Sequence, residues 1–250
     1  MKHQNKLAVL SALGGAAIAV TVMLAAAILG LFPQRLDGAQ IRSYLLSHPE
    51  MLVEMQLKLD EKDAEDTARE QRTAMQAINR KAFLDPRIAF LAGPPGAKRT
   101  LVEFFDYNCP YCRASLPAVK KFYEAHKNDT RFSFIEFPIK GPDSIVAARA
   151  SLAARKQPDK FLAFHFALLG EDSLVTDDVI FADAAKTGLD VAKLKADMQS
   201  RDIDRAIDIS HKLALSAKID GTPTFIINGH LHPGVVDDDD LKDLIKQKPV

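Results

Sequence analysis

The amino-acid sequence predicts an α/β core that is interrupted by a block of helices and preceded by a long helical arm. From residue 85 the patterns succeed one another in the order strand, strand, helix, strand. Helical periodicity then covers about residues 141–219, and two further strand-like runs and a final helix follow. A sheet whose third and fourth strands are separated by one helical block is typical of an α/β core with a helical insertion.

The first 31 residues have the pattern of an export segment. No charged residue occurs from Leu7 to Leu31, and Lys2 and Lys6 precede this apolar run. A positive flank before an apolar run is typical of a Sec-type signal peptide. The run is also long enough to span a bilayer as a retained signal-anchor. The sequence leaves the cleaved form, the membrane-anchored form and a buried soluble helix open.

Residues 32–84 are predicted to form a linker and a helical arm. A short helix is expected from Ile41 to Ser47, after a linker over residues 32–40. The run Ser47-His48-Pro49-Glu50 has the pattern of a capping box, with Leu46 and Met51 placed to pack around it. It is expected to begin one long helix.

This long helix is expected to end before Pro86. Its middle, from Asp60 to Arg72, is charged on nearly every side, so it has too little apolar surface to be buried in a core. We therefore expect the arm to be solvated or to associate with copies of itself as a dimer or trimer. A helix folded back on its own domain is the alternative.

Residues 85–250 are predicted to form the α/β domain. Asn228-Gly229 between two apolar runs is a strong hairpin signal. Asp237 to Asp240 place negative charge at the start of the final helix, where the helix dipole favours it. The expected strands are Pro86–Gly93, Arg99–Tyr107, Arg131–Ile139, Thr224–Ile227 and His230–Val236, and the expected flanking helices are Cys109 to about Lys127 and Leu241–Gln247.

The only two cysteines, Cys109 and Cys112, form a Cys-x-x-Cys pair between the second expected strand and the helix that follows it. A cysteine that opens a helix lies near unpaired backbone N–H groups and the positive end of the helix dipole, which favours the thiolate. A second thiol one turn along is placed to form and break a disulfide with the first. Pro110 suits the first helical position, and Tyr111 occupies the other place between the cysteines.

Two other uses of the cysteine pair are possible. A purely structural disulfide of this spacing would close a small ring and restrain little chain. A zinc site normally needs four ligands, and no second cysteine pair exists, although two thiolates can hold Cu(I). The histidines give little support to a metal site. Those on helical segments, His126, His165 and His211, are expected at the surface or the edge of the core, and the pair His230 and His232 flanks the hairpin.

Two segments resemble the DsbA-like branch of the thioredoxin superfamily. Leu101-Val102-Glu103-Phe104-Phe105-Asp106-Tyr107-Asn108-Cys109-Pro110-Tyr111-Cys112 resembles its active-site block, and Gly221-Thr222-Pro223-Thr224-Phe225 resembles its cis-proline loop. The resemblance covers roughly residues 85–248 and implies a thioredoxin fold with an inserted helical domain. The arm is similar to that of ScsC-type exported proteins, some of which trimerise. Tyr111 differs from the histidine of the archetypal oxidase.

The resemblance also implies roles for residues around the pair. Cys109 would be the exposed attacking thiolate and Cys112 the buried resolving thiol. Thr222 and Pro223 would be joined by a cis bond beside Cys109, where the Thr222 backbone pairs with a substrate strand; a generic turn is the alternative. Glu103 would be a buried acid beneath the pair that exchanges a proton with Cys112, although a surface glutamate is also compatible with the pattern.

Together these features predict an exported thiol–disulfide oxidoreductase, an oxidase or an isomerase, that acts on cysteines of exported proteins with a membrane redox partner. No cofactor is expected beyond the Cys109–Cys112 disulfide. The alternative is a copper-binding or chaperone-like exported protein without redox turnover. The formal net charge is zero with acids and bases interspersed, which gives no footprint for nucleic acid.

Overall fold

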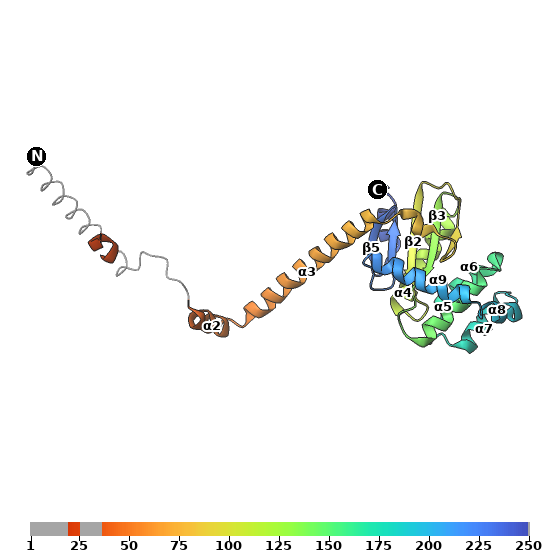
Figure 1. Ribbon diagram of the computed structural model, residues 1–250, viewed down its shortest axis with the longest axis horizontal. Coiled ribbons are helices and arrows are strands. Elements are labelled where there is room, and N and C mark those ends of the chain that lie inside the picture. Colours follow the sequence, from red (N-terminus) through yellow and green to blue (C-terminus); the bar gives the residue numbers. More distant parts are fainter. Residues whose placement is uncertain (1–19, 26–36, 250) are drawn as a thin grey trace, which may run out of the picture. The chain divides into compact units, whose positions relative to one another are not determined.

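The structure is a computed structural model that describes residues 20–25 and 37–249 (Figure 1). It divides the chain into two compact units, Met1–Asp63 and Ala64–Val250. Most of the expected export segment lies outside the described residues, and residues 20–25 are helical. Within residues 20–25 and 37–249, none of the helices combines the length and the apolar character needed to cross a bilayer.

The described arm consists of α2 (Gly38–Ser47) and α3 (Glu50–Ala77). The prediction of a capping box at Ser47 was wrong. Ser47 is the last residue of α2, and its hydroxyl donates to the carbonyl of Tyr44 at 2.9 Å. The capping box lies ten residues earlier, where Asp37 and Gln40 each accept a bond from the other's backbone N–H. The helix therefore begins inside the segment that was expected to be a linker.

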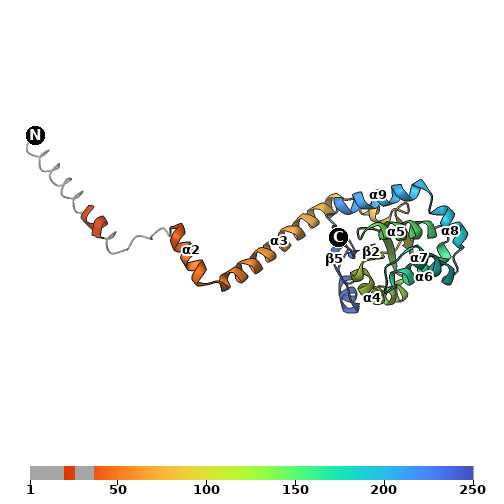
Figure 2. The same cartoon turned by 90° about the horizontal axis from the view of Figure 1, so that it is seen from below.

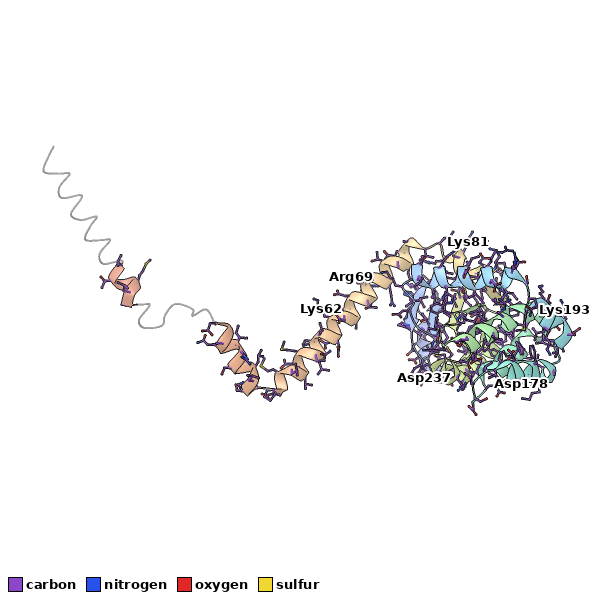
Figure 3. All side chains as sticks on the ribbon, turned by 60° about the horizontal axis from the view of Figure 1, so that its bottom comes forward. Lys62, Arg69, Lys81, Asp178, Lys193 and Asp237 are labelled. Carbon is purple, nitrogen blue, oxygen red and sulfur yellow. The ribbon has the colours of Figure 1, made fainter. Side chains whose placement is uncertain are left out.

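Apolar side chains of the first unit are exposed along both helices. Leu46 is 71% exposed, which rules out its expected packing role, and Leu52 is 73% exposed. Charged side chains such as Lys62 and Arg69 project from α3 (Figure 3). A helix that exposes both its apolar and its charged residues has little of its own unit to pack against. The other exposed apolar side chains of this unit's arm are Ile41, Tyr44, Leu45, Val53, Met55, Leu57 and Leu59.

The end of α3 belongs to the second unit. Met75 is buried in its core, and Gln71 donates to the carbonyl of Lys218 at 3.0 Å. The helix ends at Ala77 rather than just before Pro86. Asn79 caps a short 3-10 helix, η1 (Arg80–Leu84), which carries the chain to the first strand.

A five-stranded sheet forms the centre of the second unit, in the order β1-β3-β2-β4-β5. β2 pairs with β3 in parallel and with β4 in antiparallel orientation, so it is the central strand. The strands are β1 (Ala89–Ala92), β2 (Arg99–Phe105), β3 (Thr130–Glu136), β4 (Thr224–Ile227) and β5 (His230–Pro233), most of them shorter than expected. All five predicted strands are present, and the predicted α/β core is confirmed.

Helices cover both faces of the sheet. On one face, α4 (Pro110–His126) and α6 (Pro158–Leu169) pack over Phe132 and Phe134. On the other, Phe83 of η1 contacts Phe104, and His211 of α9 (Arg201–Ser216) contacts Phe137. The inserted helices α5 to α8 are grouped together in both ribbon views (Figures 1 and 2). They are α5 (Pro142–Ala154), α6 (Pro158–Leu169), α7 (Asp177–Lys186) and α8 (Val191–Asp197), followed by α9 (Arg201–Ser216).

The C-terminal helix α10 (Asp238–Leu244) begins earlier than expected. Asp237 is its N-cap and accepts bonds from the backbone N–H groups of Asp239 and Asp240. The acidic run therefore forms the cap and first turn of the helix rather than preceding it, and its charges lie where the helix dipole stabilises them.

Candidate active site

The central strand β2 carries the chain directly to the cysteine pair. Leu101 to Phe105 are buried, and after a short turn Cys109 takes the N-cap position of α4 with extended backbone angles. Pro110 is the first helical residue, where its missing N–H leaves no bond unmade. The backbone N–H groups of Tyr111 and Cys112 in the first turn of α4 act on the Cys109 sulfur and lower its pKa, as predicted.

The two thiols lie in contact and have opposite acid–base character. Both are free, in the dithiol state. The pKa of Cys109 is lowered to about 5, and the largest cause is a hydrogen bond from the Cys112 thiol. The Thr222 side chain and the backbone N–H groups of Cys112 and Tyr111 lower this pKa further, whereas burial of the sulfur raises it. Burial raises the pKa of Cys112 far above its ordinary value, and its bond to Cys109 and the charge of Glu103 raise it further.

The expectation that Cys109 is exposed was wrong. Neither sulfur-bearing residue has accessible surface, although Cys112 lies deeper among protein atoms. The Cys109 thiol points at the carbonyl oxygen of Thr222, 3.1 Å away. The side chain therefore turns inward against the neighbouring loop instead of outward to solvent.

The loop before β4 lies beside Cys109. The Thr222–Pro223 peptide bond is cis, as the resemblance implies. Thr222 is buried, and among the described residues its hydroxyl has no hydrogen-bond partner within normal distance. That hydroxyl is therefore free to donate to a Cys109 thiolate, which agrees with its lowering effect on the pKa of Cys109.

Glu103 is buried beneath the pair, as the resemblance implies. It has no accessible surface, and both of its carboxyl oxygens lack a hydrogen-bond partner within the described part of the chain. Burial raises its pKa to about 8. The charge of Glu103 is in turn one of the causes that raise the pKa of Cys112, so the two groups are coupled.

The two tyrosines near the pair have different environments. Tyr111 is 60% exposed next to the cysteines, so it is available to contact a substrate. Tyr107, by contrast, is buried, and its hydroxyl bonds to Ser151 at 2.8 Å and to Nδ1 of His165 at 2.9 Å. His165 was expected near the surface and is instead fully buried, where burial lowers its pKa to about 3.

Sequence reasoning missed a second buried acid, Glu136. On the parallel strands β2 and β3, Glu103 lies opposite Phe134 and Phe105 lies opposite Glu136. Because residues two apart on a strand point to the same face, the two acids share one face of the sheet. Burial is the largest cause that raises the pKa of Glu136 well above its usual range. A hydrogen bond with Ser151 and the positive charge of Arg155 lower this pKa but do not offset the effect of burial. The acid ends a run of phenylalanines and isoleucine, which could have indicated a buried carboxyl.

Residues that could hold a metal ion are not grouped in this structure. Over residues 20–25 and 37–249, no cluster of three or more histidine, cysteine or acidic side chains has the geometry of a metal site.

A sequence profile of the DsbA-like thioredoxin domain matches residues 100–246, which include both cysteines and the cis-proline loop. The chain belongs to the DsbA-like thioredoxin family. The resemblance inferred from the two motifs is thereby confirmed, and the predicted class, thiol–disulfide oxidoreductase, is that of the family. A second profile, that of the N-terminal domain of the copper resistance protein ScsC, matches residues 38–65 of the arm.

Solved structures of DsbA-like proteins agree with this membership. A thioredoxin-like oxidoreductase from Silicibacter pomeroyi is 39% identical, with a TM-score of 0.62 over 67% of this chain and 96% of that one. ScsC from Proteus mirabilis, in a conformation described as transitional, is 30% identical, with a TM-score of 0.63 over 83% of this chain and 93% of that one. The second likeness extends into the arm.

Curated DsbA-like relatives differ in length. Disulfide bond formation protein D of Bacillus subtilis is 30% identical over 168 residues, which are 62% of this chain and 75% of that protein. A Na(+)/H(+) antiporter NhaA of Herminiimonas arsenicoxydans is 30% identical over 154 residues, but the chain spans only 24% of its length. The chain therefore spans three quarters of one of these relatives and about a quarter of the other.

The acid–base character of Cys109 predicts its pH–rate profile. Alkylation follows the thiolate fraction, so the rate of Cys109 modification by iodoacetamide should be half-maximal near pH 5 and close to its plateau at neutral pH. In a Cys112→Ala variant the midpoint should move to higher pH, because the strongest hydrogen bond to the thiolate is lost. Mass spectrometry of the quenched protein measures both. A midpoint near the value of about 8.5 for an ordinary cysteine would contradict the stabilisation of the Cys109 thiolate by its hydrogen bonds.

The burial of Glu103 predicts how stability depends on pH. The folded pKa is raised, so the folded state keeps a proton that the unfolded state loses, and stability falls as pH rises from the unfolded pKa of 4.5 to the folded value of about 8. In that window Glu103 alone contributes a slope of about 1.4 kcal/mol per pH unit. Urea unfolding of Glu103→Gln should show this slope removed and stability at neutral pH increased. The exposed Glu124→Gln is the matched control, and equal slopes in both variants would refute the assignment.

Proposed function

We propose that the protein catalyses thiol–disulfide exchange with cysteines of exported proteins through a mixed disulfide at Cys109. The observation that carries this proposal is the asymmetry of the pair. Cys109 has a pKa of about 5, whereas the pKa of the adjacent Cys112 is raised far above its ordinary value. One thiol is therefore ionised and ready to attack or to leave, and the other stays protonated until the mixed disulfide must be resolved.

In the oxidising direction, a substrate thiolate attacks the Cys109 sulfur of the Cys109–Cys112 disulfide. The bond between the two cysteines breaks, a bond between substrate and Cys109 forms, and Cys112 leaves with the electron pair. A proton from Glu103 reaches Cys112, because a buried thiolate at that place is strongly disfavoured. A second substrate thiolate then attacks the substrate sulfur, which leaves the substrate oxidised and Cys109 as its stabilised thiolate.

The reverse steps reduce a substrate disulfide. Cys109 attacks, a substrate thiolate leaves, and Cys112 resolves the mixed disulfide after it passes its proton to ionised Glu103. With a pKa of about 8, Glu103 holds both protonation states in useful amounts near neutral pH. In our proposal Thr222 and Pro223 form the edge beside Cys109 on which an extended substrate segment pairs, and Pro110 and Tyr111 tune the pair.

The physiological direction follows from the reduction potential of the pair. A thiolate stabilised to a pKa of about 5 favours the dithiol form and so an oxidising disulfide, whereas a self-associating arm favours an isomerase. Alkylation mass shifts across glutathione buffers measure the potential. A value near −120 mV, roughly that of a dithiol oxidase, supports the oxidase, and a value near or below roughly −180 mV supports an isomerase or reductase that a membrane partner keeps reduced.

We place the protein outside the cytoplasm, in the periplasm or an equivalent compartment. The apolar run of residues 7–31 with its positive flank supports Sec-dependent export, either as a cleaved signal or as an inner-membrane anchor. We assign residues 1–31 to this segment, residues 32–84 to the linker and arm, and residues 85–250 to the catalytic domain. An oxidising compartment supports the use of the pair as a redox centre without a further cofactor.

We propose that copies of the chain associate through the arm. The support is the row of exposed apolar side chains on α2 and on the part of α3 before residue 64, together with the match of residues 38–65 to the ScsC N-terminal domain. Leu52, Met55 and Leu59 follow the spacing of one helix face and line a groove. Association would bury this face in the way an amphipathic helix requires.

Copper handling is the alternative function, and one observation favours it. The profile that matches the arm is named for a copper resistance protein. Cys109 and Cys112 are adjacent thiols, and soft thiolates select Cu(I). In that case copper would be cargo held by the pair, and binding of Cu(I) to the dithiol would persist without any turnover of disulfide substrates.

Replacing Cys112 should trap the intermediate. A Cys112→Ser variant should accumulate a mixed disulfide with a disulfide-bonded peptide, because no second thiol is present to resolve it. Cys109→Ser should accumulate none, since the remaining thiol is deeply buried and its pKa is raised. Non-reducing gels and intact-mass spectrometry detect the adduct. Equal trapping by both variants, or by neither, would refute the role of Cys109.

Removing the arm should change the oligomeric state. Light scattering after size exclusion should give a dimer or trimer for residues 37–250 and a monomer for residues 64–250. Within the arm, Leu52→Asp should dissociate the oligomer, because it places a charge on the apolar face. The matched control Glu61→Lys should not, because Glu61 is exposed outside the groove that Leu52 lines. A monomer of the longer chain at all concentrations would end the oligomer proposal.

A further inference from the structure

The three residues before Cys109 each bond to a different part of the helical insert or to the segment that leads into it. Asp106 accepts hydrogen bonds from the backbone N–H groups of Ile139 and Lys140, at 2.7 and 2.9 Å, just before α5 begins. Tyr107 bonds to Ser151 on α5 and His165 on α6. Asn108 accepts a bond at 2.8 Å from the N–H of Val175, between α6 and α7.

Asp106 also connects these contacts to Cys109 itself. Its second carboxyl oxygen accepts a bond from the N–H of Asn108 at 2.8 Å, and its carbonyl accepts one from the N–H of Cys109 at 3.0 Å. The side chain is buried and is an acceptor in all three of its bonds. One residue thus ties the segment entering the insert, the turn after β2 and the N-cap of α4 together.

We propose that the helical insert sets the position of the Cys109 sulfur, and that Asp106 and Asn108 are the positioning residues through which it does so. Neither side chain bonds to either cysteine sulfur, so neither is a catalytic residue. The inference deepens the proposed function, because it assumes that Cys109 is the reacting thiol.

The reason is the short range of the bonds that stabilise the thiolate. The Cys109 sulfur depends on the Cys112 thiol, the Thr222 side chain and two backbone N–H groups of α4. A hydrogen bond weakens steeply as its length and angle depart from their optimum. If the turn of residues 106–108 shifts, Cys109 moves relative to Thr222 on the other loop, and several of these bonds weaken together.

The test compares Asp106→Asn and Asn108→Ala with Ser133→Ala. The last variant removes a buried hydrogen bond, from Ser133 to the carbonyl of Phe83 at 2.6 Å, from strand β3, outside the cysteine site. All three should lose stability in urea unfolding. The readouts are the midpoint of the Cys109 alkylation profile and the reduction potential of the pair, neither of which needs a substrate protein.

We expect the Cys109 midpoint to rise in both loop variants and to stay unchanged in Ser133→Ala. A rise of about one pH unit in the midpoint is a tenfold decrease in the ionisation constant of the Cys109 thiol. It corresponds to a reduction potential of the cysteine pair that is about 30 mV more negative. The sign separates two causes in Asp106→Asn. Loss of a nearby negative charge alone would lower the midpoint, whereas loss of positioning raises it.

Asn108→Ala decides the proposal, because it removes one bond without changing charge. An unchanged or lowered midpoint in this variant would overturn the positioning role, and a lowered midpoint in Asp106→Asn would assign to that residue only the effect of its charge. If the wild type forms no mixed disulfide while the midpoints shift as expected, the proposed function fails and the positioning role stands.

Discussion

The pairing of β2 with both of its neighbours is the constraint on which the rest of the site depends. In the register of β2 and β4, Phe104 lies opposite Thr224, so the end of one strand and the start of the other meet at the same edge of the sheet. Cys109 follows the first strand by a short turn, and Pro223 immediately precedes the second. Two segments more than a hundred residues apart in the chain are thereby brought together by backbone hydrogen bonds of the sheet core.

The same strand provides the electrostatics of the site. Because β2 is central and covered on both faces, Glu103 has no route to solvent, and Glu136 on β3 shares its face. Carboxyl groups in such a place keep their proton to higher pH than usual, since burial disfavours the charged form. The site therefore combines a thiolate stabilised by a helix start with acids kept neutral by the sheet beneath it. Both effects arise from where the backbone places each group.

The sequence was most informative where one local pattern carries one physical cause. The Cys-x-x-Cys spacing was sufficient for the pair and the Asn-Gly turn for the last hairpin, whereas the cis bond followed from the resemblance of the Gly-Thr-Pro-Thr loop to its family. Helix ends were less predictable, because several residues compete for each cap: Asp37 caps α2, and Ser47, with an equally suitable side chain, ends it. The inward turn of Cys109, and the contacts of Asp106, Tyr107 and Asn108, depend on segments from the insert that come near only after folding, so no local pattern encodes them.

The absence of accessible surface at both sulfurs, in the described dithiol state, has a consequence for chemical durability. Low-pKa cysteines are the ones that peroxides convert first to sulfenic acid and then, irreversibly, to sulfinic and sulfonic acids. That damage requires the oxidant to reach the sulfur as well as a thiolate to be present. A Cys109 sulfur without accessible surface meets small oxidants only when the surrounding loops open. Cover of this kind limits the loss of a reactive sulfur to over-oxidation between its encounters with partners.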